Sequence, residues 1–447
     1  MIGLGIEGID LVRFLAGQGA RVTVSDARPA EALSDALAAI ADVDATLSLG
    51  GNRPEDATSA DCVFVSQGVP RDLPAITAAE DAGVPVSSMA QLFLDLCPAP
   101  VAAVTGSSGK TTTTALVGAM LEASGQNYVV GGNIGVGLLG LLERIEPHTR
   151  VMIELSHTQL ETVTRSPELA CVTNVTPNHL DHYSWSAYVA LKRRIFQFQR
   201  PEDTCVFNLD NEVSASFARE TPGRVAYTSL VRSLPGDGVA LVDGVVTRFE
   251  GSTSFAVAAR SDIRLRGQHN VENVLSAVAL ASRLGVSDQQ AAAAIRTFTG
   301  VPHRLEPVAT IADVVYINDS IATTPERTLA GMRSFEQPLV LLLGGRHKYL
   351  PVGELVSEAT RRCRAVIAFG EAGEMFASAV RDADGGSSVQ VEQVADVETA
   401  VRAAHRLAQG GDVVLFAPAG SSFDAYPNFE RRGAAYREAV RQLAGED

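Results

Sequence analysis

The chain has 447 residues, of which 46% are hydrophobic and 20% charged, a composition typical of folded globular proteins. At about 100–200 residues per domain, this length allows two to four domains. The 37 basic and 52 acidic side chains leave a formal net charge of -15, which argues against a nucleic-acid or membrane-surface partner, because such partners need a basic surface.

The five cysteines are widely spaced and form no CxxC pair, which argues against a disulfide framework or a structural zinc site and fits a reducing cytoplasm. No apolar run approaches the roughly 20 residues of a membrane span. The N-terminus also lacks the pattern of a signal peptide. We therefore expect a cytoplasmic protein without a membrane partner.

Short β-branched runs alternate with Ala- and Leu-rich stretches of helical period along almost the whole chain. This alternation predicts an α/β fold in which helices cover parallel sheets. The expected strands include 21–25, 61–66, 101–105, 151–155 and 339–343, and the expected helices include 30–41 and 110–123. Proline-rich or Gly-Pro segments at 97–100 and 300–302 suggest three domains, with bounds of about 1–95, 96–299 and 300–447.

The first motif along the chain is the GxGxxG of residues 3–8, with Asp26 after the next strand. This is the pattern of a dinucleotide-binding turn, but only Met1 and Ile2 precede it where a full strand is usual. Three interpretations stay open. The motif fits the NAD site of an oxidoreductase, a helix N-terminus that holds the diphosphate of another nucleotide, or a plain glycine-rich turn.

The strongest local motif is VAAVTGSSGKTTTT at residues 101–114, where an expected strand leads through a glycine-rich loop into a helix. Glycines let several backbone N–H groups turn toward one anion. In such a loop Lys110 reaches the β- and γ-phosphates, and the Thr111 hydroxyl binds Mg²⁺. The full GxxxxGK[ST] pattern would need glycine where Val104 stands, so this is a shortened phosphate loop. The alternative is a simple helix cap.

Polar residues gather after two further apolar strands. Glu154 ends one strand, where a carboxylate in the same domain as a phosphate loop fits a magnesium ligand or, alternatively, points to solvent. The segment NVTPNHLDHY at 174–183 follows another strand, and its His179 and Asp181 could ligate a metal or orient one another. Lys192 either belongs to that site or lies on a basic helix face with its two arginine neighbours.

The order of these blocks resembles the Mur ligases of bacterial peptidoglycan synthesis over nearly the whole chain, and most closely their glutamate-adding members. The matching blocks are TGSSGKTTTT, GGNIG, ELSHTQLE, NVTPNHLDHY with YVALK, GQHNVENV, PHRLE, NDSIATT, LLLGGRHK and SSFDAYPNFERRG. The folate-polyglutamate ligases share the phosphate loop but are not expected to carry NFERRG. The resemblance implies three α/β domains: N-terminal Rossmann-like, central P-loop ATPase-like with a parallel sheet, and C-terminal Rossmann-like.

The resemblance also implies a reaction. ATP phosphorylates the carboxylate of UDP-N-acetylmuramoyl-L-alanine, and the amine of glutamate attacks the acyl phosphate to give an amide, ADP and phosphate. Two Mg²⁺ ions and a carbamylated Lys192 would assist. The partners would be small-molecule substrates, and the enzyme would be a monomer.

Site residues follow from the resemblance position by position. The catalytic group would be Lys110, Lys192, His179 and Glu154. The metal ligands would be Thr111, Glu154, His179 and carbamylated Lys192. ATP would be bound by Gly106, Ser107, Ser108, Gly109, Lys110, Thr111, Thr112, Asn270, Asn273, Arg304 and Asp319. The acceptor would be bound by Gly3, Gly5, Gly8, Asp26, Arg28, Asn133, Ser156 and Gln159, and glutamate by Thr323, Lys348, Ser422 and Phe429.

Two positions depart from the family pattern. Gln67 stands where a proline is usual in the turn near the uracil, and Ile321 replaces a lysine next to the reacting centre. The block NDSIATTP resembles that of related ligases that add L-glutamate, whereas the block NFERRG favours a ligase that adds D-glutamate. The enantiomer is therefore open at this point, with D-glutamate favoured. A nucleotide-binding regulator without catalysis would be expected to lack Glu154, His179 or Lys192, and all three are present.

Overall fold

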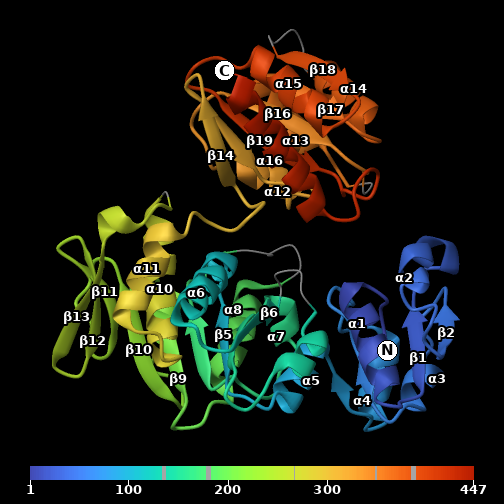
Figure 1. Cartoon of the computed structure of the whole chain (residues 1–447). Helices are drawn as coiled ribbons and strands as arrows, with labels where there is room; N and C mark the ends of the chain where they lie inside the picture. Colours follow the sequence, from blue (N-terminus) through green and yellow to red (C-terminus); the bar gives the residue numbers. More distant parts are fainter. Residues whose placement is uncertain (133–136, 178–182, 266, 348–349, 384–388, 447) are drawn as a thin grey trace. The chain divides into compact units, whose positions relative to one another are not determined.

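The computed structural model describes residues 1–132, 137–177, 183–265, 267–347, 350–383 and 389–446. The chain divides into two compact units, Met1–Phe298 and Thr299–Asp447 (Figure 1). Each unit is an α/β structure built on a mainly parallel sheet, which confirms the fold class expected from the alternating pattern. None of the helices in the described ranges is long and apolar enough to cross a membrane.

The first unit begins with two pairs of parallel strands, β1 with β2 and β3 with β4. Ile2 forms parallel bridges to both Ser25 and Val65, so the first residues do act as a short strand between β1 and β3. The sequence suggested that this strand was almost missing, and it is indeed reduced to one bridging residue. The elements of this region are α1 (Ile6–Gly17), β1 (Val22–Asp26), η1 (Ala30–Leu33), α2 (Ser34–Ala38), β2 (Ala45–Leu49), α3 (Pro54–Thr58), β3 (Val63–Phe64), α4 (Pro74–Asp81), β4 (Val86–Ser87) and α5 (Met89–Leu96).

The main sheet of this unit has nine strands in the order β13-β12-β11-β10-β9-β8-β5-β7-β6. Strands β5 to β11 are parallel, and β12 and β13 extend the edge as antiparallel strands. The strands are β5 (Val101–Thr105), β6 (Tyr128–Gly132), β7 (Arg150–Glu154), β8 (Leu169–Val172), β9 (Thr204–Asn208), β10 (Arg224–Ser229), β11 (Gly238–Val242), β12 (Val245–Glu250) and β13 (Thr253–Ala259).

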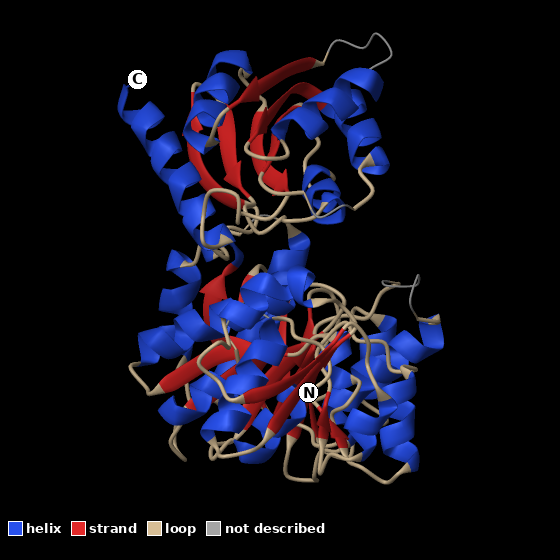
Figure 2. Cartoon of the chain, turned by 90° about the vertical axis from the view of Figure 1, so that its right-hand side faces the viewer, coloured by secondary structure: helices blue, strands red, loops and turns tan. Residues whose placement is uncertain are grey.

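Helices cover both faces of this sheet (Figure 2). One apolar core packs α6, α10 and α11 against one face, and a second packs α5, α8 and η2 against the other. Leu11 of α1 joins the second core, so the N-terminal region shares apolar packing with the main sheet. The helices are α6 (Lys110–Ser124), η2 (Leu139–Arg144), α7 (His157–Leu160), α8 (Trp185–Gln197), α9 (Glu212–Phe217), η3 (Arg260–Asp262), α10 (Gln268–Arg283) and α11 (Asp288–Thr297).

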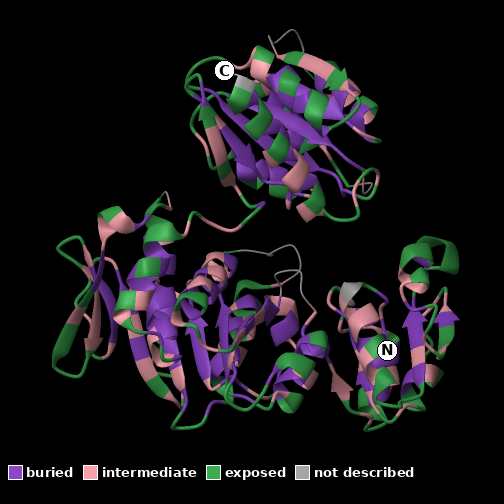
Figure 3. Ribbon diagram, in the orientation of Figure 1, coloured by how far each residue is buried: buried purple, intermediate pink, exposed green. Residues whose placement is uncertain are grey.

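The second unit has a six-stranded sheet in the order β14-β15-β19-β16-β17-β18, in which only the edge strand β14 is antiparallel. Its four inner strands, β15, β19, β16 and β17, are buried between two layers of helices, whereas the edge strands β14 and β18 are largely half-buried or exposed (Figure 3). The elements are β14 (Glu306–Ile311), β15 (Val314–Asn318), α12 (Pro325–Met332), β16 (Leu339–Gly344), α13 (Gly353–Arg362), β17 (Cys363–Phe369), α14 (Gly373–Ala383), β18 (Gln390–Val394), α15 (Val397–Leu407), β19 (Val413–Ala419) and α16 (Phe429–Glu446).

Most expected elements are present within one or two residues, but the helix expected over 30–41 is broken. It forms the 3-10 turn Ala30–Leu33 followed by the five-residue α2. Leu33 is the one buried side chain of the turn, and α2 has none. A stretch with so little apolar surface to bury gains little from packing as a continuous helix.

Candidate active site

The glycine-rich loop lies between β5 and α6, at the carboxyl end of a strand that is buried throughout. Gly106 and Gly109 both have positive φ, at 154° and 83°. A Cβ atom at Gly106 would lie 2.0 Å from Thr173 Oγ1, and one at Gly109 would lie 2.1 Å from Asn273 Oδ1. Only glycine fits either position, because both the backbone conformation and the nearby atoms exclude a side chain.

The loop is braced by the segment that follows β8. Ser107 Oγ donates to the Thr176 carbonyl at 3.0 Å and lies 3.1 Å from the Tyr188 hydroxyl. The backbone N–H of Ser108 donates to Asn174 Oδ1 at 3.0 Å. The segment after β8 and Tyr188 of α8 therefore hold the loop in its curved form.

The N-terminus of α6 is open to a ligand. Its first helical residue is Lys110, and Gly109 at the cap position offers no side chain to accept from the helix N–H groups. Lys110 Nζ donates to the carbonyl of Gly106 at 2.9 Å and to that of Ser107 at 3.3 Å, so the amine lies directly over the loop. Backbone donors, the positive end of a helix dipole and an amine together form a site for a phosphate chain.

Lys192 lies on α8 and is only 1% exposed. Its Nζ donates to Thr105 Oγ1 at 3.2 Å and lies 5.2 Å from the centre of the Tyr188 ring. Burial, and secondarily the charge of Lys110, hold the pKa of Lys192 well below its usual range, although Glu154 opposes the shift. The basic helix face that the sequence left open for Lys192 is therefore excluded, because this amine is buried beside the loop.

The residues around the loop fit a magnesium ion. Glu154 ends β7 beside β5 and is 1% exposed, and Thr111 is buried in the first turn of α6. Mg²⁺ prefers oxygen ligands and usually takes one or two carboxylates together with phosphate oxygens. The described residues contain no group of three or more His, Cys, Asp or Glu side chains placed to hold a metal by themselves. A hydroxyl, a carboxylate and a phosphate chain match this chemistry.

Asn273 lies against the loop from the other side. It is buried in the second turn of α10, where its Nδ2 donates to Asn270 Oδ1 at 3.0 Å. α10 follows Gly267, which has a φ of 88°, and packs on α6. The two asparagines expected to bind ATP therefore lie at the same end of α10, next to the phosphate loop.

The N-terminal GxGxxG forms a second loop that leads into a helix, α1. A Cβ at Gly8 would lie 2.3 Å from the Gly3 carbonyl oxygen, so the helix passes very close to the loop. Asp26 Oδ2 accepts from the Leu4 N–H at 2.8 Å and from Arg28 at the same distance. Burial would raise the pKa of Asp26, but these hydrogen bonds outweigh it and hold the pKa at about 2. Asp26 and Arg28 thus support the loop as an ion pair.

A hydrogen-bond network connects this N-terminal region to α7. Gln67 Nε2 donates to Glu7 Oε1 at 2.5 Å, and Gln67 Oε1 accepts from Thr158 Oγ1 at 2.9 Å and from Ser156 Oγ at 3.3 Å. Gln159 Nε2 also donates to Glu7 Oε1, at 2.9 Å. Ser156 and Gln159, expected at the acceptor, thus lie together at the start of α7. No role was expected for Glu7, because the network joins residues that are far apart in the chain.

In the second unit, Asp319 follows β15 and is 5% exposed. Its Oδ1 accepts from the Leu305 N–H at 3.1 Å, and burial raises its pKa to about 6 despite the nearby charges of Arg304 and Arg327. The exposed Arg304 sits in a turn where His303 and Leu305 have φ angles of 63° and 42°. The sequence placed Arg304 and Asp319 at one site, and the structure brings their segments together.

Arg432 connects the loops that follow β15 and β19. It is fully buried on α16, and its guanidinium donates to Ser320 Oγ, to the Ser320 carbonyl and to the Gly420 carbonyl at 2.9–3.2 Å. Ser320 Oγ in turn donates to the carbonyl of Phe429. Ser422 is buried, whereas Thr323 and Phe429 are half-buried. The NFERRG tail contains Arg432, but no role for this residue could be predicted from the sequence. Its partner Ser320 is 112 residues away, and its partner Gly420 lies in a loop.

Four of the residues considered for a site, Asn133, His179, Asp181 and Lys348, lie outside the described residues. Of the others in the first unit, the structure gathers Gly106, Gly109, Lys110 and Lys192 around one strand end, with Asn273 beside them. Thr105, Asn174 and Tyr188 also join this group; they belong to the blocks TGSSGKTTTT, NVTPNHLDHY and YVALK, in which no individual role was assigned to them. Their positions in the sequence could have indicated them: Thr105 ends β5, Asn174 follows the end of β8, and Tyr188 lies one helical turn before Lys192.

Three family models match successive parts of the chain: the MurD-like N-terminal domain of Mur ligases over residues 1–88, the Mur ligase middle domain over 104–281, and the Mur ligase glutamate ligase domain over 303–420. The UDP-N-acetylmuramoylalanine–D-glutamate ligases of Acetivibrio thermocellus and Symbiobacterium thermophilum are 38% and 39% identical. The alignments cover 99% of this chain and 96% and 98% of those proteins.

Solved structures show the same fold at lower identity. The UDP-N-acetylmuramate-alanine ligase MurC from Thermotoga maritima superposes with a TM-score of 0.53 at 19% identity, over 99% of this chain and 98% of that one. MurF from Acinetobacter baumannii superposes with a TM-score of 0.54 at 18% identity, over 94% and 92% of the two chains.

Proposed function

The chain belongs to the Mur ligase family, and we propose that it is an ATP-dependent ligase that joins D-glutamate to UDP-N-acetylmuramoyl-L-alanine in peptidoglycan precursor synthesis. The observation that carries this proposal is the braced phosphate loop beside the buried Lys192 and Glu154. This loop belongs to a chain that aligns over 99% of its length with D-glutamate ligases, at 38–39% identity. This combination favours phosphoryl transfer over the oxidoreductase that the N-terminal glycine motif allowed.

The phosphate loop and its surroundings would do the phosphoryl transfer. ATP supplies the γ-phosphoryl group, and Thr111 and Glu154 would hold a Mg²⁺ ion on its oxygens. The backbone N–H groups of the loop and Lys110 Nζ would bind the remaining phosphate charge. Transfer to the acceptor carboxylate gives an acyl phosphate; attack by the glutamate amine forms the amide bond and releases phosphate. Because negative charge gathers on both reacting groups, neutralisation by these cations and donors would be the main catalytic contribution.

Lys192 would act as a carbamate. Burial lowers the pKa of this amine and so favours its neutral, nucleophilic form. Its nitrogen can form a bond to CO₂ and release a proton, which converts the amine to a carbamate with one negative charge. An ammonium repels Mg²⁺, whereas a carbamate offers it oxygen ligands, so a second magnesium ion held by Lys192 and His179 becomes chemically reasonable.

The remaining residues would bind the substrates. The region 1–95 would hold the UDP part of the acceptor, the region 96–299 ATP and the acceptor carboxylate, and the region 300–447 glutamate. The roles of the individual residues would be those that the family resemblance implies: ATP at Gly106, Ser107, Ser108, Gly109, Thr112, Asn270, Asn273, Arg304 and Asp319; the acceptor at Gly3, Gly5, Gly8, Asp26, Arg28, Asn133, Ser156 and Gln159; glutamate at Thr323, Lys348, Ser422 and Phe429. We also propose that the enzyme works as a cytoplasmic monomer without a nucleic-acid or membrane partner.

Addition of L-glutamate is the second candidate, favoured by Ile321 in place of the usual lysine. The structure supports a substitute for that lysine, since Arg327 Nη1 lies 3.5 Å from the carbonyl oxygen of Ile321. A cation is therefore present near this position without a lysine in the block. Together with the names of the full-length relatives, this supports D-glutamate.

Phosphate release tests the proposal. The purified chain should release phosphate from ATP only when UDP-N-acetylmuramoyl-L-alanine and D-glutamate are both present. Lys110→Ala should lower kcat by about 10²–10³-fold, because the γ-phosphate loses its nearest cation. Arg219→Met, which removes an exposed charge elsewhere in the same unit, is the matched control and should leave the rate unchanged. Phosphate release that needs neither the acceptor nor the amino acid would overturn the proposal.

A further inference from the structure

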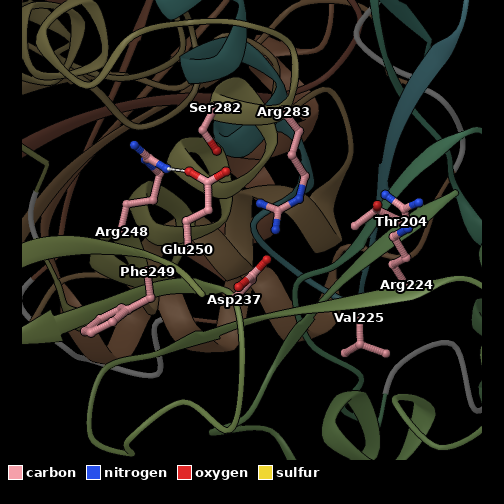
Figure 4. Close-up of a pocket in the computed structure, with 9 residues that line it drawn as sticks. All are labelled: Thr204, Arg224, Val225, Asp237, Arg248, Phe249, Glu250, Ser282 and Arg283. Atoms are coloured by element: carbon pink, nitrogen blue, oxygen red, sulfur yellow. Dashed lines mark hydrogen bonds and ion pairs between the residues drawn. The ribbon is translucent and has the colours of Figure 1, made fainter. Parts of the chain in front are cut away.

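A cavity of about 260 Å³ lies away from the phosphate loop, at the other edge of the main sheet. Thr204 and Arg224 line it from the first residues of β9 and β10, whereas the phosphate loop follows the last residue of β5. Its other lining residues come from the end of β12, from the segment before β11 and from the last turn of α10 (Figure 4). Because β5, β9 and β10 run parallel, the cavity and the loop lie at opposite ends of the strands.

One cation in this cavity is poorly paired. Among the described residues, the guanidinium of Arg283 donates to a single acceptor, the Ala279 carbonyl at 2.9 Å, and forms no ion pair. Figure 4 shows it pointing into the space that the carboxylates of Asp237 and Glu250 also face. Burial lowers the pKa of Arg283, while Asp237 and Glu250 oppose that shift, so the charges act on one another without direct contact. Most of the five N–H donors of this side chain are left for a ligand or water.

The other charges of the cavity are balanced. Arg248 donates to Asp288 through Nε and Nη2, both at 2.8 Å, and to Glu250 at 2.8 Å. With Asp288 included, the three arginines are matched by three carboxylates, so the cavity has no net charge. Asp237 Oδ1 accepts from the Gly251 N–H at 2.8 Å and, in the described part of the chain, forms no ion pair. Arg224 is exposed and, in the described part of the chain, its guanidinium has no partner; its charge offsets the second carboxylate that Arg248 holds. Arg283 and Asp237 are then the unpaired cation and the unpaired carboxylate that face one space.

Such a site selects a ligand that carries both charges. A simple anion would leave Asp237 unmatched, and a simple cation would leave Arg283 unmatched, and either mismatch costs binding energy in a partly buried site. The volume equals about nine water molecules at roughly 30 Å³ each, which is the size of a small metabolite. Thr204 and Ser282 add hydroxyl groups. The charges of Arg224, Arg248, Glu250 and Asp288 sum to zero, so no net charge remains for a charged ligand side chain.

We propose that this cavity binds a free α-amino acid with an uncharged side chain, whose carboxylate pairs with Arg283 and whose ammonium group pairs with Asp237. The site is separate from the glutamate site of the proposed ligase and does not rest on that activity. α10 has 16 residues and is about 24 Å long; it carries Asn270 and Asn273 in its first two turns, beside the phosphate loop, and Arg283 at its last residue, at the cavity. The cavity and the loop therefore share one rigid element.

Calorimetric titration of the full chain, without ATP or acceptor, tests the site. The probes are L-leucine and L-serine, each with its two one-charge analogues: 4-methylpentanoate and 3-methylbutylamine for leucine, 3-hydroxypropionate and ethanolamine for serine. At least one amino acid should bind saturably, and its analogues should bind at least tenfold more weakly. Binding by neither amino acid, or equal binding by a carboxylate analogue, would overturn the proposal.

Variants assign the binding to this cavity. Arg283→Met and Asp237→Asn should each weaken it at least tenfold, and Arg283→Lys should weaken it less than Arg283→Met because one charge is kept. Arg219→Met, an exposed arginine outside the cavity, and Lys110→Ala, at the phosphate loop, should leave it unchanged. If Arg283→Met does not fold, Asp237→Asn and Arg283→Lys decide. Binding that survives Asp237→Asn or disappears in Lys110→Ala would contradict the assignment.

Discussion

At the scale of single residues, lysine is rare in this chain. Only Lys110, Lys192 and Lys348 occur among 37 basic residues, and the rest are arginines. All three lysines stand at positions assigned to ATP, metal or glutamate. Arginine serves surface ion pairs as well as lysine does, but it does not lose its proton and offers no nucleophilic amine. The distribution fits a chain that uses lysine where an amine is needed.

This scarcity makes the carbamate at Lys192 directly observable. Incubating the full chain with ¹³C-bicarbonate should give a carbamate carbon resonance from Lys192 by NMR, because burial lowers the pKa of its amine. The N-terminal amine, whose pKa burial lowers to about 6, can give a second resonance. Lys192→Arg should remove the Lys192 resonance, and Lys110→Arg, the matched control at the loop, should keep it. The same carbamate resonances in Lys192→Arg as in the unaltered chain, or none in the unaltered chain, would show that Lys192 is not carbamylated.

Asp319 makes the second unit sensitive to pH. Its pKa is about 6 in the folded chain, above the usual 3.8, because the carboxyl is buried. The folded state therefore binds this proton more tightly than the unfolded state, so the free energy of unfolding falls as pH rises from about 4 to about 6. The loss approaches 3 kcal/mol at most, by the shift of about two pKa units.

Asp319→Asn should remove that loss and stabilise the second unit above about pH 6, while keeping an oxygen to accept from Leu305. Hydrogen exchange in β15 and β19, measured at about pH 4 and about pH 7, reports the local stability. The variant should protect these strands more than the unaltered chain at the higher pH only. If the variant and the unaltered chain were equally protected at both pH values, the buried, charged state of Asp319 would be contradicted.

At the scale of elements, the turn from β5 to α6 depends on close packing against α10. Gly109→Ala would place a Cβ 2.1 Å from Asn273 Oδ1 in a backbone with φ of 83°, so the loop must move. We expect at least a tenfold loss of ATP affinity. Gly125→Ala at the other end of α6 is the matched control, since it has φ of 70° but no atom within 4 Å of the new Cβ.

Nucleotide titration and thermal unfolding separate the two effects. Both variants should lose roughly 1 kcal/mol of stability from the positive φ. Only Gly109→Ala should lose ATP affinity. Equal ATP affinity in the two variants would mean that the loop shape near Asn273 does not matter for the nucleotide.

The same elements show what the sequence could predict. β5 and α6 begin within a residue of expectation, because alternating apolar runs and the glycine loop are local signals. The contact of Lys192 with Thr105 joins residues 87 apart, and that of Arg432 with Ser320 joins residues 112 apart. No local pattern encodes such pairs, since they depend on how the strands are ordered in the sheet. The family resemblance placed Lys192 near the metal but could not give its burial or its low pKa.

At the scale of the whole molecule, the chain is built from two units with separate cores. The two apolar cores of the second unit contain only residues beyond Thr299, whereas Leu11 of the N-terminal region packs into a core of the main sheet. A unit that buries its own sheet between two helix layers has what independent folding requires.

We therefore expect a fragment of residues 299–447 to fold alone and to unfold in one cooperative step with denaturant, as followed by circular dichroism. A fragment of residues 1–95 is the comparison and should be less stable, because it loses the core that it shares with the main sheet. A gradual, non-cooperative transition of the 299–447 fragment would contradict the division into two units.

Competition between the two enantiomers of glutamate tests the central claim most directly. The chain would be incubated with ATP, Mg²⁺, UDP-N-acetylmuramoyl-L-alanine and equal amounts of isotope-labelled D-glutamate and unlabelled L-glutamate, and the product mass would be measured. We predict a product that carries the label of D-glutamate and forms with one ADP per amide bond. A product with the mass of unlabelled L-glutamate, or ADP formation without a ligated product, would contradict the account.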